Sequence, residues 1–104
     1  MNTTDSITQT KEDMIKLVNY LINNGYVYED NVSMSTVYLS KCVNNEDRVY
    51  ALTAPHEGNA NRWMLRADTV DNIDRWGTAV YEQFYDTVDD FIDRALTDLE
   101  EKWN

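Results

Sequence analysis

The stretch AVYEQFYDTVDDFIDRALTDLEEK, residues 79–102, decides the fold, because it is the longest part of the chain with a helical period. Its apolar residues recur every three or four positions, which is the spacing of one helix face. These positions, with two that precede the stretch, are Ile73, Trp76, Val80, Phe84, Val88, Phe91, Ala95 and Leu99. Because glycine weakens a helix interior and threonine favours a helix start, Gly77 and Thr78 predict a short helix followed by a long one.

A second helical pattern lies near the N-terminus. It begins at Thr10, which resembles a helix cap because Asp13 follows three positions later. One apolar stripe runs along it through Met14, Leu17, Val18, Leu21 and Ile22. Asn23, Asn24 and Gly25 end it, since glycine tolerates a left-handed conformation. The polar residues 1–9 are expected to form a loose lead-in.

Between the two helical regions, the sequence favours strands. Three segments alternate apolar and polar residues, which predicts strands near 32–38, 49–54 and 62–67. Pro55 ends the second segment, because proline cannot donate to a strand ladder. Residues 44–47 are expected to form a turn and 56–61 a loop. The sequence therefore predicts one α+β domain over 1–104, in the order α-β-β-β-α-α, with helices covering a small three-stranded antiparallel sheet.

Composition restricts the function. The chain of 104 residues carries 19 Asp and Glu against 9 Lys and Arg, which gives a net charge of −10. Such a protein is poorly suited to bind nucleic acid or an anionic membrane directly, because both need a basic surface. No stretch is long and apolar enough to span a bilayer, and the polar N-terminus does not resemble a signal peptide. We therefore expect a cytoplasmic protein.

The negative charge is concentrated in the last third of the chain. Residues 1–67 hold 8 acids and 6 bases, a net charge of −2, whereas residues 68–104 hold 11 acids and 3 bases, a net charge of −8. On a helix over 79–102, five acids fall within about 60° of one another, opposite the apolar stripe. This predicted acidic ridge consists of Glu82, Asp86, Asp89, Asp93 and Glu100. Its like charges repel one another, and a basic partner would offset that cost.

A line of carboxylates resembles a nucleic-acid strand in charge and in form. Successive ridge residues would rise by about 4.5–6 Å, against about 3.4 Å per phosphate on a DNA strand. A cleft lined with Lys and Arg that holds a nucleic-acid backbone would accept the ridge as well. The predicted partner is thus a basic nucleic-acid-binding protein, bound through these five acids, and the association should weaken as salt rises.

The size, the acidity and the acid-studded segment YEQFYDTVDDFIDRALTDLEE resemble a class of phage-encoded anti-defence proteins. That class includes anti-CRISPR and anti-restriction inhibitors, several of which occupy DNA-binding sites. The resemblance is one of kind and carries no residue roles. It implies an inhibitor in the host cytosol that occupies the nucleic-acid-binding site of a CRISPR or restriction nuclease by DNA mimicry.

Catalytic chemistry is not indicated. The sequence contains no phosphate-binding glycine loop, nucleophile elbow or zinc-protease motif. The single histidine, His56, is expected in an exposed loop with no nucleophile to activate. The single cysteine, Cys42, is expected to pack as a small side chain in a strand. Acids at helical spacing do not form a calcium loop. We therefore expect no enzyme activity, no cofactor and no dedicated metal site.

A plainer interpretation stays open beside the inhibitor. Acidic helix faces commonly serve solubility alone. The chain would then be a non-catalytic interaction or adaptor module that uses a sheet edge, the 55–61 loop or exposed aromatic residues as its contact. Trp103, close to the C-terminus, is a candidate for an exposed contact in a homodimer.

Overall fold

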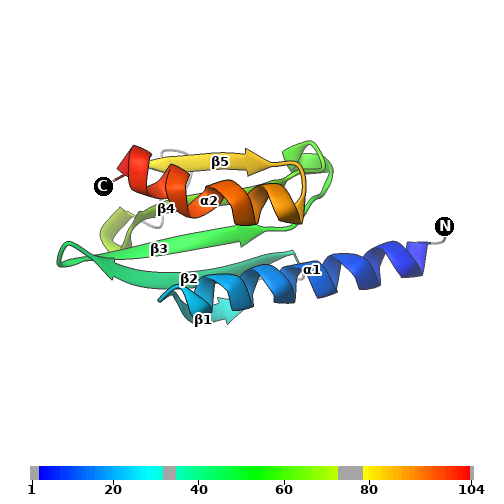
Figure 1. The fold of residues 1–104 in the computed structure, drawn as a ribbon, viewed down its shortest axis with the longest axis horizontal. Coiled ribbons are helices and arrows are strands. Elements are labelled where there is room, and N and C mark those ends of the chain that lie inside the picture. Colours follow the sequence, from blue (N-terminus) through cyan, green and yellow to red (C-terminus); the bar gives the residue numbers. More distant parts are fainter. Residues whose placement is uncertain (1–2, 32–34, 73–78, 104) are drawn as a thin grey trace.

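A computed structural model describes residues 3–31, 35–72 and 79–103. It has an α+β fold in which two helices lie side by side on one face of a five-stranded antiparallel sheet (Figure 1). The strands follow one another across the sheet in sequence order, so that every neighbouring pair is joined by a direct connection. The predicted α+β class is therefore confirmed, whereas the predicted number of strands is not.

The elements have the following bounds. The helices are α1, Thr3–Asn23, and α2, Val88–Trp103. The strands are β1, Val27–Asn31; β2, Thr36–Val43; β3, Glu46–Thr53; β4, Trp63–Thr69; and β5, Tyr81–Tyr85. Two short 3₁₀ helices are η1, Glu57–Asn59, and η2, Val70–Asn72.

The end of α1 forms where the sequence predicts it. Gly25 has a φ of 94°, a left-handed conformation that glycine adopts without steric cost. Its N–H donates to the carbonyl of Ile22 over 3.1 Å, and the N–H of Tyr26 donates to the carbonyl of Leu21 over 3.1 Å. This pair of bonds is a Schellman motif, which satisfies the last carbonyls of the helix and turns the chain into β1.

A tight turn sets the register of the central strands. Asn44 and Asn45 have φ values of 53° and 65°, as a two-residue type I′ hairpin between β2 and β3 requires. Leu39 then lies opposite Tyr50 in the ladder. Because side chains alternate between the two faces of a sheet, this register brings the largest apolar residues of β2 and β3 onto the face that the helices cover.

The core lies between that face and the two helices. Leu17 and Leu21 of α1 and Phe91 of α2 are fully buried, and so is Leu52 at the centre of the sheet. The ring of Phe91 meets that of Tyr85 edge to face, with 5.1 Å between the ring centroids. Each helix therefore buries one stripe and leaves its other side to the solvent.

Several boundaries differ from the sequence-based expectation. α1 begins at Thr3, so that residues 3–9 continue the helix instead of forming a loose lead-in. β1 and β5 add an edge strand on each side of the predicted three. The expected start of a strand at 32–34 and the expected short helix at 73–78 lie outside the described residues.

The largest error concerns the segment 79–102, which is not one helix. Its first part is β5, a turn follows at Asp86 and Thr87, and only the part from Val88 onward is helical. As a result, Val80 of the predicted apolar stripe is 56% exposed, whereas Phe91 is buried. Ile22, expected in the buried stripe of the first helix, is 42% exposed, because it lies beyond the edge of the face that α1 packs on the sheet.

Candidate acidic interface

The junction between β5 and α2 determines where the predicted ridge residues lie. Thr87 caps the helix: its hydroxyl accepts a hydrogen bond from the backbone N–H of Asp90 over 3.0 Å, and its carbonyl accepts from Phe91. The carboxylate of Asp90 in turn accepts from the backbone N–H of Asp86 over 3.4 Å. The helix therefore starts after Thr87, and the two acids before that point belong to a strand and a turn.

Two of the five ridge residues pair with arginines of the same chain. Glu82, on β5, lies opposite Arg66 of β4, and their charged atoms are 3.1 Å apart. Asp86, in the turn, lies 2.7 Å from the Nε of Arg62. These pairs screen part of the charge of both acids. The continuous five-residue ridge is therefore a wrong prediction, because its first two members are not on the helix.

The other three ridge residues share one side of α2. Asp89, Asp93 and Glu100 are all exposed and fall within about 40° of one another at 100° per residue. We call these three residues the acidic face. None of them makes a hydrogen bond or ion pair with another residue of the described parts of the chain. They span about 16 Å along the helix axis, and they are therefore more widely spaced than the phosphates of a DNA strand, at about 3.4 Å each.

Two further acids of α2, Asp90 and Asp98, form hydrogen bonds with residues of the same chain. Arg94 donates two hydrogen bonds to Asp90, over 2.7 and 2.9 Å, as the four-residue spacing predicts. This hydrogen-bonded arginine lowers the pKa of Asp90, and the same contact raises the pKa of Arg94. Asp98, which the same spacing would pair with Lys102, accepts a hydrogen bond from the hydroxyl of Tyr85 over 2.8 Å. Neither acid belongs to the acidic face.

Tyrosines beneath α2 tie the helix to the sheet. The hydroxyls of Tyr81 and Tyr85 lie 3.0 Å apart, and that of Tyr85 also reaches Asp98. Burial raises the pKa of Tyr81 to about 12. Burial and the hydrogen bonds to Tyr81 and Asp98 raise the pKa of Tyr85 well above its usual value. These contacts fix the orientation of α2, and with it the direction in which the acidic face points.

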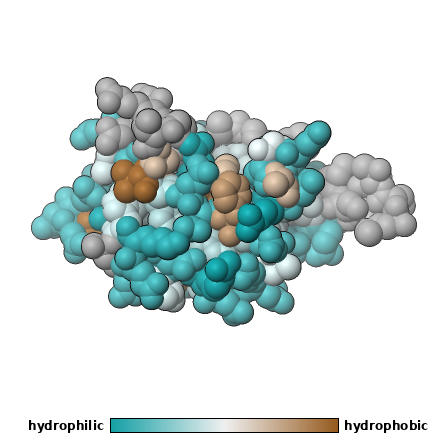
Figure 2. Space-filling view, turned by 90° about the horizontal axis from the view of Figure 1, so that it is seen from above, coloured by the Kyte–Doolittle hydropathy of each residue, from teal (hydrophilic) through white to brown (hydrophobic). Residues whose placement is uncertain are grey.

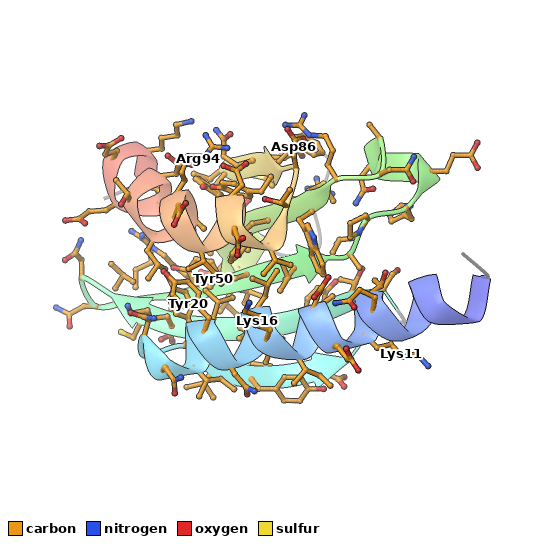
Figure 3. The ribbon with its side chains drawn as sticks, turned by 45° about the vertical axis from the view of Figure 1, so that its right-hand side comes forward. Lys11, Lys16, Tyr20, Tyr50, Asp86 and Arg94 are labelled. Carbon is orange, nitrogen blue, oxygen red and sulfur yellow. The ribbon has the colours of Figure 1, made fainter. Side chains whose placement is uncertain are left out.

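The surface on this side of the molecule is mostly polar. Figure 2 shows the side on which β5 and α2 lie, with hydrophobic atoms limited to a few separate spots on a hydrophilic surface. Asp86 and Arg94 project from this side, away from α1 (Figure 3). The arrangement suits a hydrated, charge-dependent contact better than an apolar one.

The remaining candidate residues have structural contacts. His56 is exposed in its loop, as predicted, and its Nδ1 accepts a hydrogen bond from the backbone N–H of Gly58, which caps η1. Cys42 lies in β2 but is exposed and not packed, because it points to the face that the helices leave open. Trp103 is partly buried, with the Arg48 guanidinium 4.0 Å from its ring centre. Trp103, expected as an exposed contact, is therefore only partly accessible and is less exposed than Tyr28, which is 46% exposed.

Comparison with known proteins adds no neighbour: no family model, curated protein or solved structure matches the chain. Within the described ranges, no group of three or more His, Cys, Asp or Glu side chains is arranged to hold a metal ion. No described helix is sufficiently long and apolar to cross a membrane.

The sequence analysis missed the two arginine pairs, although a signal for them was present. Arg62 and Arg66 are four residues apart, and so are Glu82 and Asp86. On two antiparallel strands, residues four apart lie on one face, so that such pairs meet in matched register. Once residues 81–85 are placed on a strand beside β4, both ion pairs follow from the spacing.

Proposed function

We propose that this protein is a non-catalytic inhibitor that binds the basic nucleic-acid-binding surface of another protein and so prevents nucleic acid from reaching it. The contact would be made by the acidic face, Asp89, Asp93 and Glu100, with Glu82 and Asp86 at its margin. The proposed target class is a host defence nuclease of the CRISPR or restriction type. The single observation that supports the proposal is the charge of the outer side of α2.

That charge is high for a helix of this length. Residues 88–103 carry six acids and two bases, a net charge of −4. One base, Arg94, is already bound to Asp90. The acidic face has no cation of its own within the described chain, and a cationic partner would relieve the repulsion among its carboxylates. Its spacing is sparse for a full copy of a DNA strand, so the proposal requires only charge complementarity over a short contact.

The test is inhibition of purified nucleases by the protein and by a charge-reversed variant. Wild-type protein is titrated into DNA-cleavage assays with a panel of CRISPR effector and restriction nucleases. We expect inhibition that weakens as salt rises, because exposed charges are screened. The variant Asp89→Lys, Asp93→Lys, Glu100→Lys should lose inhibition while it keeps its fold, which circular dichroism checks.

A matched control carries the same change of charge elsewhere. Asp47→Lys, Glu57→Lys, Asp71→Lys reverses three exposed acids outside α2. Each triple variant changes the net charge by +6, from −10 to −4. The control should still inhibit. The proposal fails if the α2 variant inhibits as well as the control, if salt has no effect, or if the wild-type protein inhibits no nuclease in the panel.

A second candidate function is an interaction module whose acidity serves solubility only. The exposed apolar residues of α1 and β1 favour it, since Ile15 is 61% and Tyr28 is 46% exposed. Binding through these residues would depend little on salt. The same assays at low and high salt therefore separate the two candidates.

A further inference from the structure

The exposed apolar residues are concentrated on one side of the molecule. Of the six large hydrophobic side chains that are exposed among the described residues, four belong to α1 and β1. Ile15 and Ile22 are seven positions apart, two turns along the same side of α1. Tyr28 of β1 and Ile15 of α1 line the same groove. This concentration is independent of α2 and of its acidic face.

The groove is mainly apolar and has a volume of about 490 Å³. Most of its wall consists of Met14, Ile15, Val18, Tyr28, Val37 and Ala54. The only charged residue on its lining is Lys11, at the end of the groove toward the N-terminus of the chain. The outer side of α1 therefore presents a ridge, Ile15 and Ile22, directly next to an apolar hollow.

The charge over most of α1 is balanced, unlike that of the whole molecule. Residues 9–23 of α1 hold Lys11 and Lys16 against Glu12 and Asp13, a net charge of zero. The complete chain has a net charge of −10. Two copies of such a protein repel one another over most of their surfaces. Residues 9–23 of α1 therefore present no net charge to a second copy, and the nearest acids of β1 are Glu29 and Asp30.

The charges on α1 also complement themselves. Glu12 and Lys16 are exposed, one turn apart, on the same flank of Ile15. Neither makes an ion pair with any residue in the part of the chain that the structure describes. When two such helices pack antiparallel about a two-fold axis, the same flank of each helix meets, with its order reversed. Glu12 of one copy then lies opposite Lys16 of the other, and the pair occurs twice.

The shape of α1 leaves room for this contact. The helix has 21 residues, about 31 Å at about 1.5 Å per residue. Its N-terminal turns extend beyond the end of the sheet (Figure 1). Lys11, on α1, lies on the side of the molecule away from Asp86 and Arg94 (Figure 3). A second copy on α1 would therefore leave Asp86 and Arg94 uncovered.

We propose that the outer side of α1 is a homodimer interface, in which the helices of two copies pack antiparallel, so that the two Ile15 side chains meet at its centre and the two grooves face each other. Tyr28 closes the contact at the edge of the sheet, and the two Glu12–Lys16 pairs set its register. The interface is isologous, so that it closes at two copies and forms no filament. It does not depend on the proposed inhibition, because its residues are not those of the acidic face.

Sedimentation equilibrium and light scattering at protein concentrations of about 10–200 µM test the proposal, a range that detects a dimer of micromolar affinity. We expect the wild-type protein to be dimeric at the upper end. Ile15→Glu should raise the dissociation constant at least about 100-fold, because it places a charge at the centre of the contact in both copies. The matched control is Val80→Glu, at a side chain that is 56% exposed and far along the chain from α1. It should leave the dimer intact.

A charge swap tests the antiparallel register specifically. Glu12→Lys and Lys16→Glu should each weaken the dimer, since each sets like charges opposite one another. The double variant should restore it, which a purely structural role of these residues would not do. Thermal melts confirm that each variant is folded. A wild-type protein that stays monomeric, a dimer that survives Ile15→Glu, or a double variant as weak as its parents would overturn the proposal.

Discussion

The two helices cover the same face of the sheet, yet their outer sides have opposite properties. The outer side of α1 is balanced in charge and carries exposed Ile15 and Ile22. The outer side of α2 carries the acidic face and has no large exposed hydrophobic residue among those described. The inner sides are alike, since Leu17, Leu21 and Phe91 are all fully buried. Packing thus determines the inner half of each helix and leaves the composition of the outer half free to differ.

The helices also differ in how they are attached. α1 packs on the sheet mainly through apolar contacts, and the hydroxyl of Tyr20 reaches the carbonyl of Ile92 in α2 over 3.1 Å. α2 has two polar ties in its C-terminal half: the hydroxyl of Tyr85 donates to Asp98, and Arg48 donates to the carbonyl of Trp103 over 2.8 Å. A surface that must present charges in a fixed direction needs such directional bonds, whereas an apolar contact tolerates small shifts of the helix.

The largest expected loss of stability follows from a substitution on the inner side of a helix, and it is compared with one on an outer side. Phe91→Ala should lower the free energy of unfolding by about 3–5 kcal/mol, because it leaves a cavity beneath α2. Ile22→Ala, on the outer side of α1, should cost about 1 kcal/mol or less, since its side chain is already partly in water. Urea unfolding at a concentration where the protein is monomeric measures both. Equal losses would show that the outer side of α1 is packed against the molecule after all.

The second prediction concerns the polar ties of α2. Tyr85→Phe keeps the ring against Phe91 but removes the hydrogen bonds to Asp98 and Tyr81. We expect a loss of about 2 kcal/mol, because a hydrogen bond to a charged acceptor is among the stronger ones. Chemical denaturation measures the loss. Tyr20→Phe, which removes the hydrogen bond from α1 to the carbonyl of Ile92 in α2, is the matched control and should cost about 1 kcal/mol.

The same tyrosines predict a decline of stability at high pH. Burial raises the pKa of Tyr26, Tyr50, Tyr81 and Tyr85 above the 10.0 of an unfolded chain. The unfolded state therefore loses these protons first, and the stability present below pH 10 is lost as the pH rises, for Tyr81 up to about 12. The melting temperature should fall steadily above pH 10, and less steeply in Tyr85→Phe. A melting temperature that stays constant up to pH 12 would contradict the burial of these hydroxyls.

The segment 79–102 shows why the periodicity of the sequence predicted the α+β class correctly but placed the acidic residues wrongly. Glu82 and Asp86 are four residues apart, a spacing that lies on one side of a helix and equally on one face of a strand. Val80 and Phe84 have the same ambiguity. The predicted helix therefore included residues 81–85, which form a strand. Tyr81 and Tyr85, which face the core, and Thr87, a good helix cap, were the local signals for a strand followed by a new helix.

The parts that were predicted correctly rest on signals with one interpretation. Gly25 marks the end of α1, since few residues other than glycine adopt its backbone conformation. Asp90, in the first turn of α2, and Arg94 both lie on the helix, where a spacing of four residues brings an acid and a base together. The ion pairs of Arg62 and Arg66 could not be predicted until β5 had been recognised, because both depend on the register between β4 and β5.

The fourth prediction tests the junction between β5 and α2. Thr87→Ala removes the side chain that accepts from the N–H of Asp90 and should cost about 1 kcal/mol. Thr87→Ser keeps the hydroxyl and should be nearly neutral. Thermal and urea unfolding measure both variants. If Thr87→Ala is neutral too, the start of α2 is set by the packing of Phe91 and not by its cap.

The smallest expected change in stability bears on how far the acidic face extends. Arg62 holds Asp86 in a pair that is well exposed, with Asp86 73% and Arg62 41% in contact with solvent. Exposed pairs contribute little, so Arg62→Gln should change the free energy of unfolding by about 0.5 kcal/mol or less.

The same substitution should also affect binding to the proposed partner. It frees the carboxylate of Asp86, which lies three residues before Asp89, the first residue of the acidic face. Inhibition of a nuclease should then become up to about 3-fold stronger at low salt, an effect below about 1 kcal/mol. Lys102→Gln removes the same charge without releasing a described ion pair and is the matched control. A gain in Arg62→Gln alone would show that Arg62 withholds Asp86 from the partner, whereas equal gains in both variants would assign the effect to net charge.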